Sequence, residues 1–273
     1  MIIFLGSGRL GNQIFQLYFL ESIRKPNEKV FAYNMDQVCK YMTGFEKFNN
    51  KEIKKFYWLF DNIFIRTLKI LAKIHIINSA IEMHNTGYHK TTKGILPVTV
   101  SFGYFQNDEY IKNCPNKNLR LKDEYIKKAA AYLKPYSDMK KVFLHIRHGD
   151  YSEDIRVPDI FLKKALNELQ ALKNFDKKNT LFILMGDDPK YYENNFLELP
   201  NRIISKNDLI TDLAIMTQCD GSIISNSTFA WIGAYFCKNT LPVYAPKYWT
   251  NWKNNSWYPL KINTKKFKFL DWR

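Results

Sequence analysis

Polar and charged residues close one of the most apolar stretches of the chain. Residues 142–151 read VFLHIRHGDY, so a hydrophobic run ends in histidine, arginine and aspartate. Alternate side chains of a strand share a face, which places His145 and Arg147 on the same side. Arginine binds a phosphate through a planar fork, and histidine can hydrogen-bond a base or a ribose. The segment predicts a phosphate-binding site, and the alternative is a structural ion pair between Arg147 and Asp150.

A glycine-rich turn near the start of the chain also favours anions. Residues 6–13 read GSGRLGNQ and match the G-x-G-x-x-G pattern between an expected strand and an expected helix. Backbone amides and the helix dipole attract an anion at such a turn, and the arginine and the Asn-Gln pair add side-chain donors. A purely structural turn is the alternative. The residues expected to contact an anion or a sugar are Gly8, Arg9, Gly11 and Asn12.

A third polar segment lies at residues 221–231, GSIISNSTFAW, after a short apolar run. Helix capping explains one serine, asparagine or threonine at such a place, but four in succession are more typical of a phosphate cradle. The residues assigned to this cradle are Ser225, Asn226, Ser227 and Thr228.

An acidic pair, Asp187 and Asp188, follows the apolar run LFILM. A carboxylate at the end of a strand can accept hydrogen bonds from guanine, and we assign this role to Asp187. Capping of the following helix is the alternative function of the pair.

The elements that must position these segments alternate between strands and helices. From residue 140 onward, short apolar runs alternate with helical patterns, as in a parallel sheet covered by helices. Ligands of such sheets bind beyond the carboxyl ends of the strands, where the polar segments lie. One expected helix carries an apolar stripe for packing on the sheet, formed by Leu162, Ala165, Leu166, Leu169 and Leu172.

The first half of the chain has a different pattern. We expect a strand at residues 2–5, a helix at 12–24 and a strand at 30–33, followed by an aromatic, basic and helical region at 45–85. The change of pattern predicts two domains, residues 1–135 and residues 136–273.

The composition excludes several classes of protein. The chain has 273 residues, 46% of them hydrophobic, and contains neither a run of about 18 apolar residues nor a signal-peptide pattern. Four cysteines without a C-x-x-C pair favour reduced thiols in the cytoplasm. The formal net charge of +15 suits phosphate-bearing substrates, anionic membranes or nucleic acid.

Basic and aromatic residues interleave at residues 51–77. Such a segment either lies on an anionic membrane surface or packs on its own domain with a lysine-rich face toward solvent.

Taken together and in this order, the motifs resemble one family. The G-R-L-G-N-Q turn, the H-x-R-x-G-D-Y strand end, the paired aspartates and the S-N-S-T-F-x-W segment are similar to those of the α-1,2-fucosyltransferases, glycosyltransferase family 11. The resemblance spans nearly the whole chain, although residues 40–130 carry little of it. His148 and Ile232 depart from the family pattern, which often has arginine and tryptophan there.

The resemblance implies a fold and a set of roles. The fold would be α/β of the GT-B type, with two Rossmann-like domains, the donor site in the cleft, and a C-terminal parallel sheet flanked by helices. Residues 1–135 would form the acceptor side, and residues 136–273 would bind the GDP-sugar. Arg147 would contact the β-phosphate of GDP-fucose, His145 and Asp187 would bind the guanosine, and the cradle would line the pyrophosphate. Asn12 would face the transferred sugar and the leaving oxygen.

The expected chemistry uses no metal and no other cofactor. The chain lacks the D-x-D pattern with which many transferases hold a metal, so fixed cations must neutralise the departing diphosphate. We assign this role to Arg147. Asp150 is the favoured base for the acceptor hydroxyl, ahead of Glu153 and Asp154, and transfer without a protein base is the alternative.

The predicted activity is inverting transfer of L-fucose from GDP-fucose to the 2-hydroxyl of a galactose-containing oligosaccharide of a surface glycan, which could be lipid-linked. GDP-colitose is the alternative donor. Outside this class, an NAD-dependent oxidoreductase with Asp36 as ribose ligand and a basic RNA-binding protein are the other candidates. We expect a cytoplasmic protein without a nucleic-acid partner, and peripheral contact with the inner face of the membrane is the alternative location.

Overall fold

The computed structural model describes residues 1–44, 63–83, 86–149, 151–173, 175–249 and 261–272. The chain forms two compact units, Met1–Arg120 with Pro259–Ile262 and Leu121–Tyr258 with Asn263–Arg273. The division falls before α6 (Asp123–Leu133), earlier than the expected boundary after residue 135. This helix belongs to the second unit because it packs against α9 (Leu209–Gln218), where the Gln218 side chain donates to the Ile126 carbonyl at 3.1 Å.

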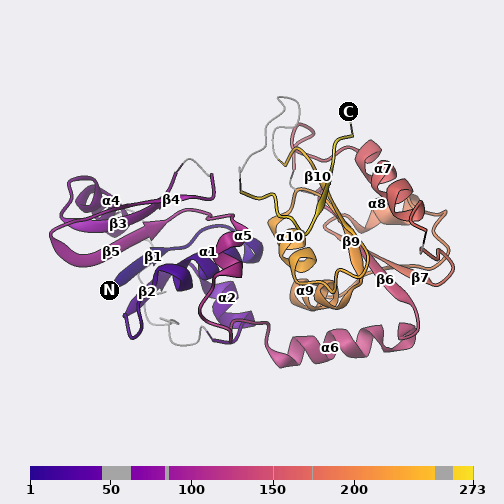
Figure 1. Ribbon diagram of the computed structural model, residues 1–273, viewed down its shortest axis with the longest axis horizontal. Helices are drawn as coiled ribbons and strands as arrows, with labels where there is room; N and C mark the ends of the chain where they lie inside the picture. Colours follow the sequence, from indigo (N-terminus) through magenta and orange to yellow (C-terminus); the bar gives the residue numbers. More distant parts are fainter. Residues whose placement is uncertain (45–62, 84–85, 150, 174, 250–260, 273) are drawn as a thin grey trace. The chain divides into compact units, whose positions relative to one another are not determined.

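The first unit is built on a five-stranded sheet with the order β2-β1-β5-β3-β4 (Figure 1). Neighbouring strands are parallel except β3 and β4. The strands are β1 (Ile2–Leu5), β2 (Val30–Tyr33), β3 (Ile77–Glu82), β4 (His89–Thr92) and β5 (Leu96–Phe102). The described helices are α1 (Leu10–Ile23), α2 (Asp36–Tyr41), α4 (Ile65–Lys73) and α5 (Asp108–Lys112). The expected opening of strand, helix and strand is therefore present.

Residues 45–85 are not helical throughout, and the prediction for this region is wrong in part. Within the described residues, α4 ends at Lys73 and the chain then enters β3. β3 lies between β4 and β5, so its side chains alternate across the sheet instead of following a helical face. Sheet pairing has overridden the helical pattern here. Residues 45–62, 84 and 85 lie outside the described residues.

The second unit is built on a six-stranded parallel sheet with the order β11-β10-β9-β6-β7-β8. Its strands are β6 (Lys140–Ile146), β7 (Thr180–Gly186), β8 (Arg202–Ile204), β9 (Gly221–Ile224), β10 (Val243–Pro246) and β11 (Lys268–Leu270). Besides α6 and α9, its helices are η4 (Lys134–Tyr136), α7 (Asp159–Gln170), α8 (Pro189–Asn194) and α10 (Thr228–Tyr235). The expected alternation of strands and helices is confirmed.

The strand order of this sheet reverses between β6 and β9. From β6 the chain continues to β7 and β8 on one side, and later to β9, β10 and β11 on the other. α7 and α8 cover one face of the sheet, and α9 and α10 cover the other (Figure 1). At such a reversal the connecting helices diverge, which opens a crevice beyond the carboxyl ends of the two central strands.

The core of the second unit holds this edge in place. All residues of β6 except Lys140 are buried, as expected for a central parallel strand. The predicted stripe of α7 packs on it: Leu162, Ala165, Leu166 and Leu169 are buried, and Leu172 is partly buried against the same cluster.

In the described part of the chain, all four cysteines are free thiols, and no helix is long and apolar enough to cross a bilayer.

Candidate active site

The ends of β6 and β9 lie side by side where the strand order reverses. The register pairs His145 with Ile224, and the Ser225 amide donates to the His145 carbonyl at 2.9 Å. Beyond this bond the chain leaves each strand in a loop. The two segments predicted to bind phosphate are therefore neighbours in space.

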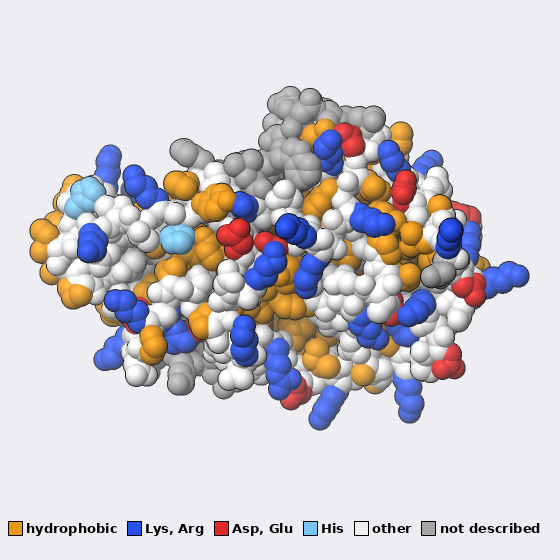
Figure 2. All heavy atoms as spheres, viewed as in Figure 1, with side chains coloured by type: hydrophobic (Ala, Val, Ile, Leu, Met, Phe, Trp, Pro, Cys, Tyr) orange, Lys and Arg blue, Asp and Glu red, His pale blue; other side chains and the backbone are white. Residues whose placement is uncertain are grey.

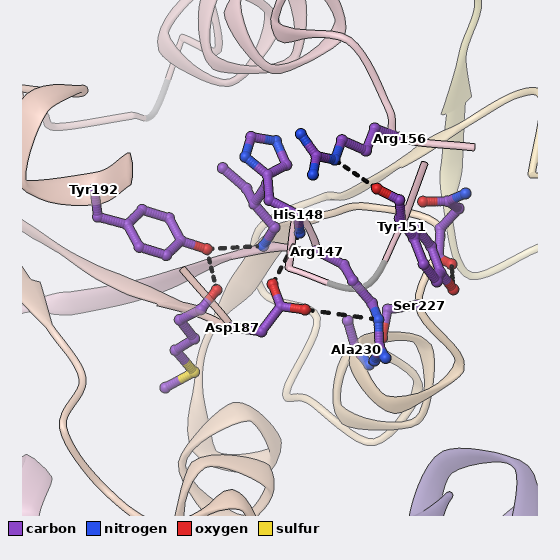
Figure 3. Close-up of polar contacts among 11 residues, drawn as sticks. Arg147, His148, Tyr151, Arg156, Asp187, Tyr192, Ser227 and Ala230 are labelled. Carbon is purple, nitrogen blue, oxygen red and sulfur yellow. Dashed lines mark hydrogen bonds and ion pairs between the residues drawn. The ribbon is translucent and has the colours of Figure 1, made fainter. Parts of the chain in front are cut away.

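Arg147 is held by two neighbours at the end of β6 (Figure 3). Its Nε lies 3.8 Å from an oxygen of Asp187, at the end of β7, and its guanidinium lies 5.0 Å from the ring centre of Tyr151. The other Asp187 oxygen accepts the His148 amide at 2.8 Å. Only 17% of the Arg147 side chain is exposed. A largely buried and oriented guanidinium of this kind suits an anionic ligand.

Tyr151 joins the loops that follow β6 and β9. Its hydroxyl donates to the Asn226 carbonyl at 3.2 Å, and the Asn226 side chain donates back to the Ile155 carbonyl at 2.8 Å. Arg156 Nε donates to the Tyr151 carbonyl at 2.8 Å (Figure 3). These bonds fix the loop after β6 and the loop after β9 against each other, so each loop restrains the conformation of the other.

Three buried side chains of the site have a polar atom without a hydrogen-bond partner. The atoms are His145 Nδ1, Ser225 Oγ and Asn226 Oδ1, and none of the three residues is more than 6% exposed. An unsatisfied buried polar group costs roughly 1–3 kcal/mol. Three of them at one sheet edge indicate a polar ligand that completes their hydrogen bonds.

His145 is a neutral member of this group. The pKa of its imidazole is lowered to about 4, mainly by burial and also by the Arg147 guanidinium, while the Asp187 carboxylate acts in the opposite direction. At neutral pH the ring therefore offers one donor and one acceptor. The positive charge at this position comes from Arg147 and not from His145.

The four residues of the predicted cradle have different tasks. Ser227 is the N-cap of α10, and its hydroxyl accepts the Ala230 amide at 3.4 Å. Thr228 begins the helix and is partly exposed. Ser225 and Asn226 carry the unpartnered atoms. The structure thus brings all four to the start of α10, where the helix dipole favours an anion.

The two members of the acidic pair, Asp187 and Asp188, have different roles. Asp188 caps α8, where its side chain accepts the Tyr191 amide at 3.3 Å. Both oxygens of Asp187 already face protein groups, the Arg147 guanidinium and the His148 amide. This geometry favours a positioning role for Asp187 over the predicted contact with guanine. Asp150, the expected base and the alternative partner of Arg147, lies outside the described residues.

Tyr192 supports the site, although no sequence motif singled it out. Its hydroxyl accepts the Ile146 amide at 2.9 Å and donates to the Met185 carbonyl, which links the last residues of β6 and β7 (Figure 3). A Cβ at Gly186 would collide with the Ile146 carbonyl oxygen and with this hydroxyl. The glycine that ends the apolar strand β7 was the available sequence signal.

In the first unit, Gly8, Arg9, Gly11 and Asn12 form the turn from β1 into α1. Gly8 has a φ of +76°, and a Cβ there would lie 2.5 Å from Asn12 Nδ2, so both conformation and packing require glycine. Arg9 is exposed at the N-cap, and Gly11 is buried in the first helical turn. Asn12 Oδ1 accepts a hydrogen bond from Gln106 Nε2 at 2.9 Å.

Two glutamines of α1 hold the shape of this turn. Gln13, which we expected to be a donor to an anion, instead donates to the Gly8 carbonyl at 3.2 Å and accepts the Gln37 amide at 3.0 Å. Gln16 binds both backbone groups of Ser7 at 3.1 Å and donates to the Gly103 carbonyl at 2.9 Å. The role of Gln13 is therefore structural.

Residues 1–261 match the sequence model of glycosyl transferase family 11. The chain belongs to this family. The O-antigen biosynthesis glycosyltransferase WbnK of Escherichia coli is 26% identical, with 92% of this chain and 95% of WbnK covered. The α-1,2-colitosyltransferase of Escherichia coli is 25% identical, with 89% and 90% covered.

Solved fucosyltransferase structures share the fold of this family 11 glycosyltransferase. The fucosyltransferase NodZ from Bradyrhizobium aligns with a TM-score of 0.54 at 12% identity, covering 85% of this chain and 91% of NodZ. A mutant of FUT1 of Arabidopsis thaliana in complex with GDP aligns with a TM-score of 0.53 at 13% identity, covering 91% and 71%. The predicted GT-B-like α/β fold is confirmed, while the donor site in a cleft stays a prediction.

Membership of family 11 makes the chain a glycosyltransferase, and it decides against the oxidoreductase and the RNA-binding protein. Among the residues that the structure describes, no three His, Cys, Asp or Glu side chains gather in a metal-binding arrangement. Metal-independent transfer by this enzyme stays a prediction.

Proposed function

We propose that this family 11 glycosyltransferase moves L-fucose from GDP-fucose, with inversion, to the 2-hydroxyl of a galactoside in a surface glycan such as O-antigen. The observation that carries the donor assignment is the set of unpartnered atoms on His145, Ser225 and Asn226 beside the guanidinium of Arg147. Such a group needs a ligand that is both anionic and rich in hydrogen-bonding atoms. A nucleoside diphosphate has this chemistry.

The proposed mechanism follows from the charge at the end of β6. The acceptor oxygen attacks the anomeric carbon of fucose from the face opposite the diphosphate, and the bond from that carbon to the β-phosphate oxygen breaks. The electron pair of that bond stays on the departing GDP. Arg147 and the start of α10 stabilise this negative charge, which is greatest in the transition state. From the family resemblance we assign Asn12 to the sugar and the leaving oxygen, and Asp150 to the proton of the acceptor hydroxyl, with transfer without a protein base as the alternative.

Binding of donor nucleotides tests the assignment directly. Calorimetric titration in the presence of EDTA should show binding of GDP and of GDP-fucose. The same titration with UDP or NAD should show no binding of comparable strength. Arg147→Ala should weaken GDP binding roughly a hundredfold and lower the transfer rate by about 10²–10³, because it removes a preorganised charge. The matched control is Arg66→Ala, an exposed arginine of α4.

The outcomes separate the donor class from the role of one residue. UDP binding as tight as GDP binding would contradict the donor class. Transfer above about a tenth of the wild-type rate in Arg147→Ala would contradict the role of Arg147 as the main leaving-group cation.

GDP-colitose is a second candidate donor, because one relative is an α-1,2-colitosyltransferase. Colitose lacks the 3-hydroxyl of fucose. A pocket that hydrogen-bonds this hydroxyl should prefer fucose by roughly a hundredfold or more, since the deoxy sugar would leave buried polar groups unpaired. An apolar pocket rejects an added hydroxyl only weakly. Competition between the two donors, read by the mass of the product, distinguishes these pockets.

A further inference from the structure

Two neighbouring segments of the first unit expose many aliphatic side chains. Thirteen large hydrophobic residues are exposed in the described part of the chain, and five of them lie at residues 63–74 and 95–96. The residue Ile95 is 85% exposed. Isolated exposed aliphatic residues are common, but a group of them marks an interaction surface. We call this group the α4 patch, which comprises Ile63, Ile70, Ile74, Ile95 and Leu96.

The α4 patch is continuous from the helix to the turn before β5. The Ile95 amide donates to the His75 carbonyl at 3.2 Å, and the Leu96 amide donates to the Ile76 carbonyl at 2.8 Å, so the turn lies against the end of α4. Ile70 and Ile74 are four residues apart and share one helical face.

The opposite face of α4 packs into the core of the first unit. Leu68 and Ala72 are buried in the cluster that also contains Ile77 of β3 and Val100 of β5. The helix therefore does not need the α4 patch in order to pack on its own sheet.

Basic residues predominate in the two segments that carry and flank the α4 patch. Residues 63–81 and 86–107 contain no Asp or Glu, but they contain Arg66, Lys69, Lys73, Lys90 and Lys93. In the described residues, neither Lys73 nor Lys93 forms an ion pair. In Figure 2, blue and orange side chains lie interspersed over the part of the molecule formed by α4 and β3 to β5.

We propose that the α4 patch binds the surface of an anionic phospholipid membrane. The isoleucines enter the boundary between headgroups and acyl chains, and the lysines lie among the lipid phosphates, as in interfacial amphipathic helices. Aliphatic side chains distinguish this surface from one that binds single-stranded RNA, which uses aromatic rings for stacking. The proposal goes beyond the transfer reaction, and it would place the enzyme where lipid-linked glycans are built.

Sedimentation with vesicles tests the proposal on the full chain. One set of vesicles contains phosphatidylcholine alone, and the other also contains phosphatidylglycerol. Two double variants address the two components of the α4 patch, Lys73→Gln with Lys93→Gln and Ile74→Ser with Ile95→Ser. The matched control is Lys163→Gln with Lys173→Gln, which removes the same charge from exposed positions of the second unit.

We expect binding to the anionic vesicles only, and weaker binding as salt increases. Each α4-patch variant should lower the partition coefficient about tenfold, and the control should stay close to wild type. Unchanged GDP binding and an unchanged melting temperature would show that the variants are folded, and they keep this test separate from the donor assignment.

Three results would overturn the proposal. The first is absence of binding to phosphatidylglycerol vesicles at low salt, and the second is binding that the α4-patch variants and the control weaken equally. The third is tighter binding to a homopolymeric RNA that depends on the lysines but not on the isoleucines.

Discussion

Arg147 and Asp187 project from the ends of two neighbouring strands, β6 and β7, and their charged groups lie 3.8 Å apart. The same carboxylate accepts the backbone amide of His148 at 2.8 Å. Asp187 thus orients the guanidinium and also the first residues of the loop that follows it. A cation held in this way needs little reorganisation when charge develops on a leaving group.

Asp187→Asn should therefore slow transfer more than it weakens nucleotide binding. The amide oxygen can still accept the His148 amide, but the charge that orients Arg147 is lost. We expect kcat to fall roughly tenfold or more, with the Kd of GDP within about threefold of wild type. Rate assays combined with calorimetry measure both quantities. If GDP binding collapses and the preference for GDP over IDP disappears, Asp187 binds guanine instead.

Tyr151 should contribute to nucleotide binding mainly through its ring. Tyr151→Phe loses the hydrogen bond to the Asn226 carbonyl but keeps the ring beside Arg147, so the GDP affinity should fall less than about threefold. Tyr151→Ala also removes the cation–π contact, and we expect about tenfold weaker binding. Calorimetry of the two variants separates the contributions. Equal losses would mean that the link between the loops is the more important function.

Gln106 should act on transfer through Asn12. Its Nε2 holds Asn12 Oδ1 at 2.9 Å, so Gln106→Leu frees the asparagine to rotate. If Asn12 faces the transferred sugar, Gln106→Leu should lower kcat about tenfold and leave GDP binding unchanged. The double variant with Asn12→Ala should be no slower than Asn12→Ala alone, because the two residues act as one unit. Gln170→Leu on α7 is the control, and additive losses would argue against the coupling.

His145 should make folding stability depend on pH. Its folded-state pKa of about 4 lies below the ordinary histidine value of 6.5, so the folded protein disfavours protonation. Its contribution is fully present above pH 6.5 and is lost progressively as the pH falls toward 4. Between pH 7 and pH 5 the loss should be roughly 1–2 kcal/mol.

Urea unfolding of wild type and His145→Asn at both pH values measures this difference. The variant should show a smaller loss on acidification, whatever its absolute stability. A pH dependence that is identical in His145→Asn and wild type would rule out the burial of a neutral imidazole.

Local patterns were sufficient for most elements of the second unit. A short apolar run such as residues 142–146 is typical of a buried strand when it alternates with helices that carry one apolar stripe, and α7 buries the stripe that its spacing predicted. The polar strand ends and the motifs also indicated the family. These features are local in the chain, and so they can be predicted from neighbouring residues.

Tertiary structure decided which groups meet. The strand order puts the end of β9 beside the end of β6, although 75 residues separate Tyr151 from Asn226. Asp187 and Asp188 are the same residue type at adjacent positions, but packing turns one toward Arg147 and the other to the start of α8. β3 shows the same effect, because pairing with two strands overrode a helical pattern. Such choices depend on contacts between distant segments, and the free energy of those contacts is set only when the whole sheet has assembled.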